Sequence, residues 1–154
     1  MPAMLLMDGD PEVMRYVGDG SVPDPESHER RMRGRIQENR ADGLGFWSVF
    51  HRARKNDLLG TIGLVPLPDS ADIELDYRLR RKAWGHGYAT EAAAPCLRYA
   101  FRVLRLSEVV TLVYPANLPS QRVIAKLGFA AAGRRHVNGV DLLFYSLDRQ
   151  RFSG

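Results

Sequence analysis

The sequence predicts an α/β (α+β) fold in which a mixed central sheet is flanked by helices. Runs of alternating apolar residues, typical of strands, are interspersed with helix-like runs along the 154 residues. A long helix-like run separates the strand-like segments 73–79 and 109–114, and a crossover helix of that kind joins parallel strands. Near the C-terminus, Asn138-Gly139 lies between two apolar runs and is typical of a two-residue β-hairpin turn. The sheet should therefore contain both parallel and antiparallel neighbours.

Helices are expected in four segments, most of them bounded by residues that start or stop helices. Asn117 is a typical N-cap and Gly128 a typical C-terminal stop for one of them, and Gly43 follows another. Pro95 lies inside the longest segment and should kink that helix or shift its start. The expected helical segments are 11–16, which is a short turn, 25–40, 87–104 and 118–127.

Six strands are expected, and turn-forming residues mark their ends. A polar segment at 53–57 joins the first two strands, and Pro66 and Pro68 precede the third. The expected strands are 46–52, 58–65, 73–79, 109–114, 129–137 and 140–147. No repeat or low-complexity segment interrupts this order, so residues 1–154 are expected to form a single domain.

The composition indicates a globular cytoplasmic protein. Apolar residues make up 45% of the chain, and the single cysteine, Cys96, excludes an internal disulfide framework and suits a reducing compartment. No apolar run approaches the ~20 residues that a membrane helix needs, and the segment 4–7 is too short for a signal peptide. The net charge is +4, but the densest group of arginines, at 30–35, is expected on the solvated face of one helix. We therefore expect neither a membrane nor a nucleic-acid partner.

The segment 84–91 lies between the strand 73–79 and the long helix, and its sequence is Trp-Gly-His-Gly-Tyr-Ala-Thr-Glu. Gly85 and Gly87 lack a Cβ, so the backbone there can turn sharply and approach a ligand closely. The first N–H groups of the following helix have no partner within the helix, and they and the helix dipole favour a phosphate. The segment therefore predicts a diphosphate-binding loop, although a short Gly-x-Gly turn is in some proteins only structural.

A second motif follows the strand 109–114. It begins with Asn117, places Ser120 in the first helical turn and closes with Leu127-Gly128-Phe129. With both motifs in this order, the chain resembles the GNAT superfamily of acetyl-CoA-dependent N-acetyltransferases over residues 11–147. More narrowly, it is similar to the branch that contains the ribosomal-protein N-terminal (alanine/serine) acetyltransferases. That branch carries a Trp-Gly-x-Gly-Tyr-Ala-Thr-Glu loop and an Asn-x-x-Ser helix.

The resemblance implies that acetyl-CoA is the cosubstrate and lies where the two parallel strands splay apart. Its diphosphate would meet the backbone amides of 85–90, to which His86 contributes its own N–H. Its pantetheine arm would pair near Leu79 and Asn117, and a backbone N–H near Tyr77 would hold the developing oxyanion. The residues implied to bind the cosubstrate are Tyr77, Leu79, Trp84, Gly85, His86, Gly87, Tyr88, Ala89, Thr90, Asn117 and Ser120.

Acetyl transfer needs a group that accepts the proton of the amine, and Glu74 is the first candidate, because relatives in this branch carry a glutamate at its position. Strand alternation places Glu74, Asp76 and Arg78 on one face. Two neighbouring carboxylates raise the pKa of one of them toward a useful basicity. In the alternative interpretation both carboxylates face water and pair with Arg78, and Asp76 or a water takes the proton.

The proton donor to the leaving thiolate is expected to be Ser120. Many GNAT enzymes use a tyrosine seven residues after the motif asparagine, but this chain has Ile124 there. The resemblance implies that Ser120 reaches the sulfur, and the alternative is that its hydroxyl only caps the helix. His28, His51 and His136 lack the spacing of metal ligands, so no metal is expected.

The beginning of the chain departs from the family pattern. Relatives start with an edge strand, but here residues 10–17 already match the end of the helix that follows it. The N-terminal strand is therefore expected to be missing or to lie upstream of Met1. Its loss would expose the strand 46–52, and the apolar run 140–145 also needs a cover, so a homodimer is expected.

Taken together, these features predict an acetyl-CoA-dependent N-acetyltransferase that acts by direct attack of a primary amine on the thioester. The amine is either a protein N-terminus or a small molecule, since neither 24–45 nor the last hairpin carries a recognisable acceptor code. The alternative is a non-catalytic CoA-binding regulatory module that keeps the loop without turnover.

Overall fold

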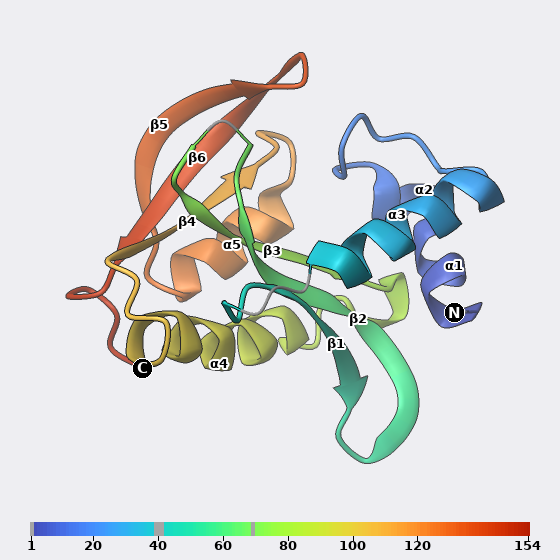
Figure 1. Ribbon diagram of the computed structural model, residues 1–154, viewed down its shortest axis with the longest axis horizontal. Helices are drawn as coiled ribbons and strands as arrows, with labels where there is room; N and C mark the ends of the chain where they lie inside the picture. The colour runs from blue at the N-terminus through green and yellow to red at the C-terminus, as the bar shows by residue number, and fades with distance from the viewer. Residues whose placement is uncertain (1, 39–41, 69) are drawn as a thin grey trace.

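The computed structural model describes residues 2–38, 42–68 and 70–154. Its helices and strands follow one another as in Figure 1. The elements are α1 (Pro2–Asp8), α2 (Pro11–Met14), α3 (Pro25–Glu38), β1 (Gly45–His51), β2 (Arg54–Pro66), β3 (Ile73–Leu79), the 3₁₀ turn η1 (Arg81–Ala83), α4 (Tyr88–Arg102), β4 (Glu108–Val113), α5 (Leu118–Lys126), β5 (Ala130–Val137) and β6 (Val140–Asp148).

The strands form one six-stranded sheet in the order β1-β2-β3-β4-β6-β5. β3 and β4 run parallel, and the other neighbouring strands are antiparallel. In the described chain, Glu74 and Val110 are the one residue pair in register between β3 and β4, so these strands separate beyond it. The predicted mixed sheet with flanking helices is confirmed.

The hairpin between β5 and β6 turns at Asn138 and Gly139, as predicted. Their φ angles are 50° and 81°, so both residues lie in the left-handed region that a type I′ turn requires. On β6, the ring of Phe144 is covered by the guanidinium of Arg135 from β5, whose Cζ lies 3.8 Å from the ring centroid. The hairpin therefore covers part of its own apolar run.

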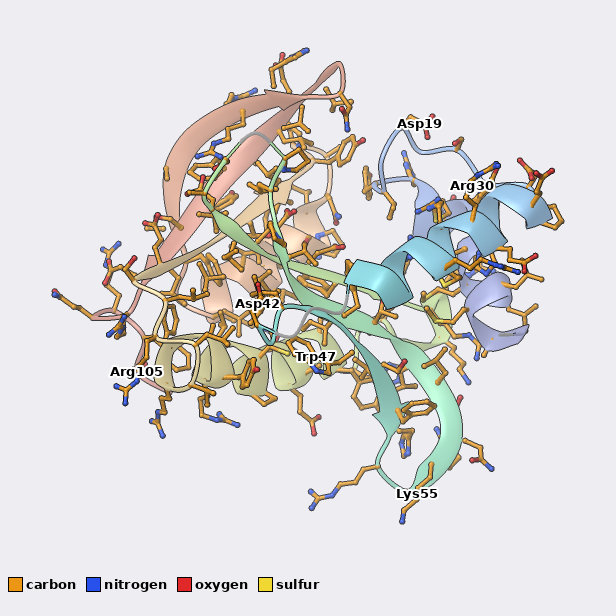
Figure 2. All side chains as sticks on the ribbon, in the orientation of Figure 1. Asp19, Arg30, Asp42, Trp47, Lys55 and Arg105 are labelled. Carbon is orange, nitrogen blue, oxygen red and sulfur yellow. The ribbon has the colours of Figure 1, made fainter. Side chains whose placement is uncertain are left out.

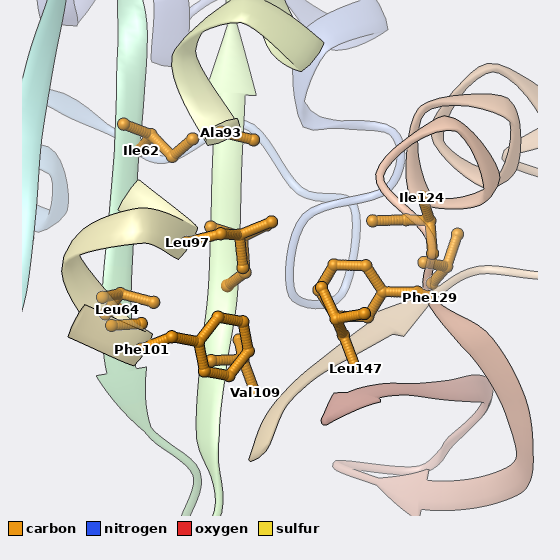
Figure 3. Packing of buried hydrophobic residues seen from close by; sticks show 12 residues of the cluster. Ile62, Leu64, Ala93, Leu97, Phe101, Val109, Ile124, Phe129 and Leu147 are labelled. Atoms are coloured by element: carbon orange, nitrogen blue, oxygen red, sulfur yellow. The ribbon is translucent and has the colours of Figure 1, made fainter. Parts of the chain in front are cut away.

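The main hydrophobic core lies between α4 and the sheet. Residues of α4 spaced three or four apart form one buried stripe, and Leu97 and Phe101 of this stripe contact the strand residues Leu64 and Val109 in the same cluster (Figure 3). Burying one such side chain contributes about 1.5–3 kcal/mol to stability. This packing fixes α4, and with it the loop at its N-terminus, relative to β3.

The helices cover both faces of the sheet (Figure 1). Leu75 of β3 belongs to the core under α4 and α5. Arg78, which strand alternation directs to the opposite face, contacts Asp8 of α1 and Met14 of α2. α4 and α5 therefore pack on one face of β3, and α1 and α2 pack on the other.

The N-terminal segment differs from the sequence-based expectation, which placed no element before residue 11. Residues 2–8 form α1, and its last two residues, Met7 and Asp8, are buried. A seven-residue helix is marginal by itself, so contacts with other elements stabilise it. β1 forms one edge of the sheet, as expected for the strand 46–52, and pairing of this edge with a second copy stays a prediction.

Other boundaries are corrected by the structure. Arg52-Ala53 alone connects β1 to β2, because His51 pairs directly with Arg54, so most of the predicted turn at 53–57 belongs to β2. Figure 2 shows Lys55 near the tip of this protruding hairpin. α2 ends at Met14, and α4 continues through Pro95 to Arg102, so the proline neither ends the helix nor moves its start. The segment 39–40 of the predicted helix 25–40 lies outside the described residues.

The charged face of α3 is exposed, as expected. Nη1 of Arg30 lies 3.6 Å from Oε1 of Glu26, and Nη2 of Arg33 lies 2.7 Å from Oε1 of Glu29. Figure 2 shows Arg30 directed into solvent. These (i, i+4) pairs lie on a solvated helix face, so they contribute little to stability. Within the residues described, no helix is long and apolar enough to cross a membrane.

Candidate active site

The loop between β3 and α4 has the backbone geometry that its glycines predict. Gly85 and Gly87 have φ angles of 75° and 80°. Gly87 is the N-cap of α4, and because glycine has no side chain, none caps the helix from that position. The first N–H groups of α4 therefore remain available to a ligand in front of the helix. This end of the helix also carries the positive end of the helix dipole.

Side chains of the loop hold it against the end of β3. The indole Nε1 of Trp84 donates a hydrogen bond to the carbonyl oxygen of Leu79 at 2.9 Å. The ring of His86 stacks on Tyr88 at 5.6 Å, and its Nδ1 lies 2.7 Å from the carbonyl oxygen of Trp84. The imidazole of His86 thus contacts other residues of the loop. Only the backbone of His86 remains to contribute to ligand binding.

The start of α5 faces this loop across a cavity. The Oδ1 of Asn117 accepts a hydrogen bond from the N–H of Ser120 at 3.2 Å, so the predicted N-cap is confirmed. Ser120 lies in the first turn of α5, where its hydroxyl reaches across to β3: Ser120 Oγ is 2.6 Å from the hydroxyl oxygen of Tyr77. Burial raises the pKa of Tyr77 to about 12, despite the hydrogen bond with Ser120, which lowers it.

The cavity has a volume of about 350 Å³ and joins these parts into one site. Of the predicted cosubstrate residues, the following line it: Tyr77, Leu79, Trp84, Gly85, Gly87, Tyr88, Ala89, Thr90, Asn117 and Ser120. His86 and Glu74 are not among the described residues that line it. The residues brought together by the two motifs are therefore neighbours in space as well as members of one sequence pattern.

Glu74 is outside the set of described residues that line the cavity and lies at the point where β3 and β4 separate. Its Oε1 accepts a hydrogen bond from the backbone N–H of Leu112 at 3.1 Å. Burial, and after it the negative charge of Asp76, raise the pKa of Glu74 to about 8 against the opposing effect of the Leu112 N–H. The carboxylate of Glu74, which is partly buried, is thus bonded to β4, and the expected influence of Asp76 on its pKa is present.

Sequence reasoning missed the wall of the cavity that comes from the N-terminal region. Glu12, Val13, Tyr16 and Val17 line the cavity together with Arg78. The hydroxyl of Tyr16 donates to the carbonyl oxygen of Ala116 at 3.3 Å, directly before the N-cap of α5. This contact joins segments about 100 residues apart, and no local pattern predicts it.

A buried charged cluster holds the N-terminal helices against β3. Asp8 Oδ1 lies 3.2 Å from Nη2 of Arg78, and Asp8 Oδ2 lies 3.2 Å from Nδ1 of His28. All three side chains are at most 5% exposed. Strand alternation predicts the face of β3 on which Arg78 lies, and the structure brings its guanidinium against Asp8 of α1.

Metal binding and thiol chemistry find no support in the part of the chain that the structure describes. No three His, Cys, Asp or Glu side chains there are placed to hold a metal ion. Burial raises the pKa of Cys96 to about 11, which keeps the thiol protonated at neutral pH.

Residues 1–130 match the family described as the acetyltransferase (GNAT) domain. The chain belongs to the GNAT family. It is therefore an acyltransferase, an N-acetyltransferase of a family that uses acetyl-CoA as cosubstrate. The fold that the sequence motifs implied is the fold of this family.

Individual relatives agree with this assignment. The FsC-acetyl coenzyme A-N(2)-transacetylase of Aspergillus fumigatus is 31% identical over 134 residues, which cover 80% of this chain and 55% of that protein. A GNAT-family acetyltransferase from Bacillus anthracis has a TM-score of 0.81 at 24% identity, covering 97% of this chain and 89% of that one. The ribosomal-protein-S5-alanine acetyltransferase of Vibrio fischeri has a TM-score of 0.67 at 19% identity, covering 84% and 75%. The two structures share the fold of this chain. A shared fold alone does not identify the acceptor.

The chemistry of the cavity fits the GNAT cosubstrate. The N-terminus of α4 offers backbone donors and a positive dipole to a diphosphate. Two cations of α5, Arg122 and Lys126, also line the cavity and add positive charge for a phosphate-bearing ligand. Groups suited to phosphate and the hydroxyls of Tyr77 and Ser120 thus line the same cavity.

Proposed function

We propose that residues 1–154 form a single catalytic domain that transfers the acetyl group of acetyl-CoA to a primary amine by direct attack on the thioester. The observation that carries this proposal is the cavity itself, which is lined both by the α4 N-terminal loop and by the hydroxyls of Tyr77 and Ser120. The loop suits a diphosphate, and the two hydroxyls offer donors to a reacting thioester. The single cysteine of the chain supports a reducing cytoplasm as its compartment.

In this proposal the diphosphate of acetyl-CoA lies against the backbone amides of the loop at 85–90. The cosubstrate continues past the end of β3, near Leu79, towards Ser120. The divergence of β3 and β4 beyond the Glu74–Val110 pair supports this path, because it leaves strand backbone without a sheet partner. Ser120 donates to the sulfur as it leaves.

Glu74 is the proposed base, acting through a water because it is not among the described residues that line the cavity. Its raised pKa of about 8 brings it close to the pKa of an α-amine, near ~8, and leaves it well below the ~10.4 of a lysine-type amine. Proton transfer is efficient when donor and acceptor have similar pKa values. Asp76, which shares the face of β3 with Glu74, is the alternative base.

A carboxyl base of raised pKa suits an α-amine, as at a protein N-terminus, and we propose this acceptor over a small alkylamine. The ribosomal-protein branch, which acetylates such termini, is accordingly the finer family placement that we propose. Its support is the pair of sequence motifs at 84–91 and 117–129.

A thiol-release assay with acetyl-CoA tests the proposal. The acceptor panel consists of peptides with free N-termini, the same peptides with blocked N-termini and a free lysine, polyamines and aminoglycosides. We expect thiol release to depend on the acceptor and to be fastest with a free α-amine. Tight binding of CoA without turnover on any acceptor would instead identify a regulatory CoA-binding module.

A further inference from the structure

Two hydroxyl groups face each other in the cavity although they come from different elements. Tyr77 lies on β3 and Ser120 on α5, 43 residues apart in the sequence, and their oxygen atoms are 2.6 Å apart. Both residues line the cavity. Different contacts hold the two residues in place. Tyr77 packs against the main core, and the backbone N–H of Ser120 donates the N-cap bond to Asn117.

The pair as a unit has one hydrogen atom left for a third partner. Each hydroxyl has a single O–H, and one of the two O–H groups is used in the bond between them. If Tyr77 donates to Ser120, the hydrogen of Ser120 is free to point into the cavity. If Ser120 donates to Tyr77, the free hydrogen belongs to Tyr77.

Proton affinities decide against Tyr77 as the net acid of the reaction. A thiol has an ordinary pKa near ~8.5, whereas the buried phenol of Tyr77 has a pKa of about 12. Moving the phenol proton to a thiolate is therefore unfavourable by a factor of roughly 1,000 or more. A neutral phenol that keeps its proton is instead a permanent hydrogen-bond donor, and the nearest acceptor recorded for it is Ser120 Oγ.

We propose that Tyr77 is a positioning residue: its hydroxyl donates to Ser120 Oγ and so directs the Ser120 hydrogen towards the thioester sulfur. This inference rests on the proposed function of the cavity. In the reaction the amine nitrogen forms a bond to the carbonyl carbon, and the carbon–sulfur bond breaks with its electron pair going to sulfur. The thiolate is stabilised by the Ser120 O–H, and the amine proton leaves to the base. The pair explains how a chain with Ile124 in place of the usual tyrosine keeps a hydroxyl donor at the sulfur.

Turnover of four variants tests the pair. Tyr77→Phe removes only the hydroxyl and keeps the ring in the core, and Ser120→Ala removes the donor to sulfur. We expect Ser120→Ala to lower kcat by about 100-fold and Tyr77→Phe by about 10-fold, both with little change in the KM for acetyl-CoA. The double variant should be no slower than Ser120→Ala, because Tyr77 acts through Ser120. Tyr99→Phe, on α4 outside the cavity and in ring contact with Trp47, is the matched control and should keep the wild-type kcat.

A binding experiment tests the same contact without turnover. Calorimetric titration compares CoA with desulfo-CoA, which lacks the sulfur, at a pH above ~9, where the CoA thiol is ionised. The wild-type protein should bind CoA about 10-fold more tightly than desulfo-CoA, since a hydrogen bond to a charged group is worth that much. The preference should fall towards unity in Ser120→Ala and in Tyr77→Phe, and it should be unchanged in Tyr99→Phe.

The two experiments separate failure of this inference from failure of the proposed function. A folded Tyr77→Phe variant with wild-type kcat and an intact preference for CoA over desulfo-CoA would overturn the role of Tyr77 while leaving the enzyme assignment in place. Additive losses in the double variant would also overturn it, because Tyr77 would then act independently of Ser120. A wild-type protein that binds neither CoA nor desulfo-CoA would overturn the proposed function, and the inference with it.

Discussion

The two faces of β3 build the site in different ways. On the face of Leu75 and Tyr77, the strand packs under α4 and α5, and the groups offered to a ligand include the backbone amides of the adjoining loop. On the face of Glu74 and Arg78, it packs against α1 and α2 through charged side chains. A ligand that binds to backbone leaves a local pattern of glycines and caps in the sequence. A surface built from side chains of distant segments leaves none.

The largest expected effect concerns the backbone-built face. Gly87→Asp adds a Cβ at a φ angle of 80° and places a carboxylate at the N-terminus of α4, where the diphosphate is proposed to bind. We expect the affinity for acetyl-CoA, measured by calorimetry, to fall by about 100- to 1,000-fold, since strain and charge repulsion each contribute about 1–2 kcal/mol. Gly139→Asp, at a φ angle of 81° in the distant hairpin, imposes the same backbone strain and should bind normally. Equal losses in both variants would mean that general strain, and not the loop, is responsible.

On the side-chain-built face, Asp8→Asn removes the negative charge shared by Arg78 and His28. We expect the free energy of unfolding, measured by urea denaturation, to fall by about 3 kcal/mol, because one partner of a buried ion pair is left uncompensated. Asp141→Asn is the matched control, since Asp141 also pairs with a histidine, His136, but at an exposed site. If Asp8→Asn is as stable as Asp141→Asn, charge pairing does not hold α1 against β3.

The next variant, Glu74→Gln, tests whether a residue on the side-chain-built face takes part in the reaction. Gln keeps an acceptor for the Leu112 N–H but cannot take a proton from the amine, so kcat near pH 8, where a large share of Glu74 is ionised, should fall about 100-fold with acetyl-CoA affinity unchanged. The loss should shrink at high pH, where more of the acceptor amine is already neutral. Asp76→Asn is the comparison. A wild-type kcat in Glu74→Gln, together with a large loss in Asp76→Asn, would assign the proton transfer to Asp76.

The same variant predicts a smaller effect on the pH dependence of stability. The pKa of Glu74 is raised from 4.5 to about 8, so between these values the folded protein holds a proton that the unfolded chain releases. This contribution to stability is complete below pH 4.5 and is lost as the pH rises through about 8. Wild-type protein should therefore lose on the order of 2 kcal/mol more than Glu74→Gln between pH 5 and pH 8 in urea denaturation. Parallel pH profiles would mean that the carboxyl is ionised throughout this range.

The difference between the faces explains which features were predictable from sequence. The loop 84–91, the N-cap Asn117 and the turn at Asn138-Gly139 depend on backbone geometry within a few residues, and the structure has the loop turn, the cap and the hairpin as predicted. Strand alternation also placed Glu74, Asp76 and Arg78 on one face correctly, because the period of two is local.

The features that were missed depend on contacts between distant segments. α1 has no strong signal of its own and is held by a partner 70 residues away, Arg78. The wall formed by Tyr16 depends on its bond to Ala116. The Tyr77–Ser120 pair joins two residues that the sequence had selected separately, Tyr77 for its backbone and Ser120 for its hydroxyl. Which residues meet in these contacts depends on how β3 packs against distant segments. A short stretch of sequence carries no information about that packing.

The structure of a complex with acetyl-CoA tests the account most directly. We expect the diphosphate at the amides of residues 85–90 and the thioester sulfur within hydrogen-bonding distance of Ser120 Oγ, with Tyr77 still bonded to that oxygen. Glu74 should lie behind the thioester, reached through a water. A diphosphate bound away from the N-terminus of α4, or a sulfur that contacts neither hydroxyl, would contradict the proposed cosubstrate site between the α4 loop and the Tyr77–Ser120 pair.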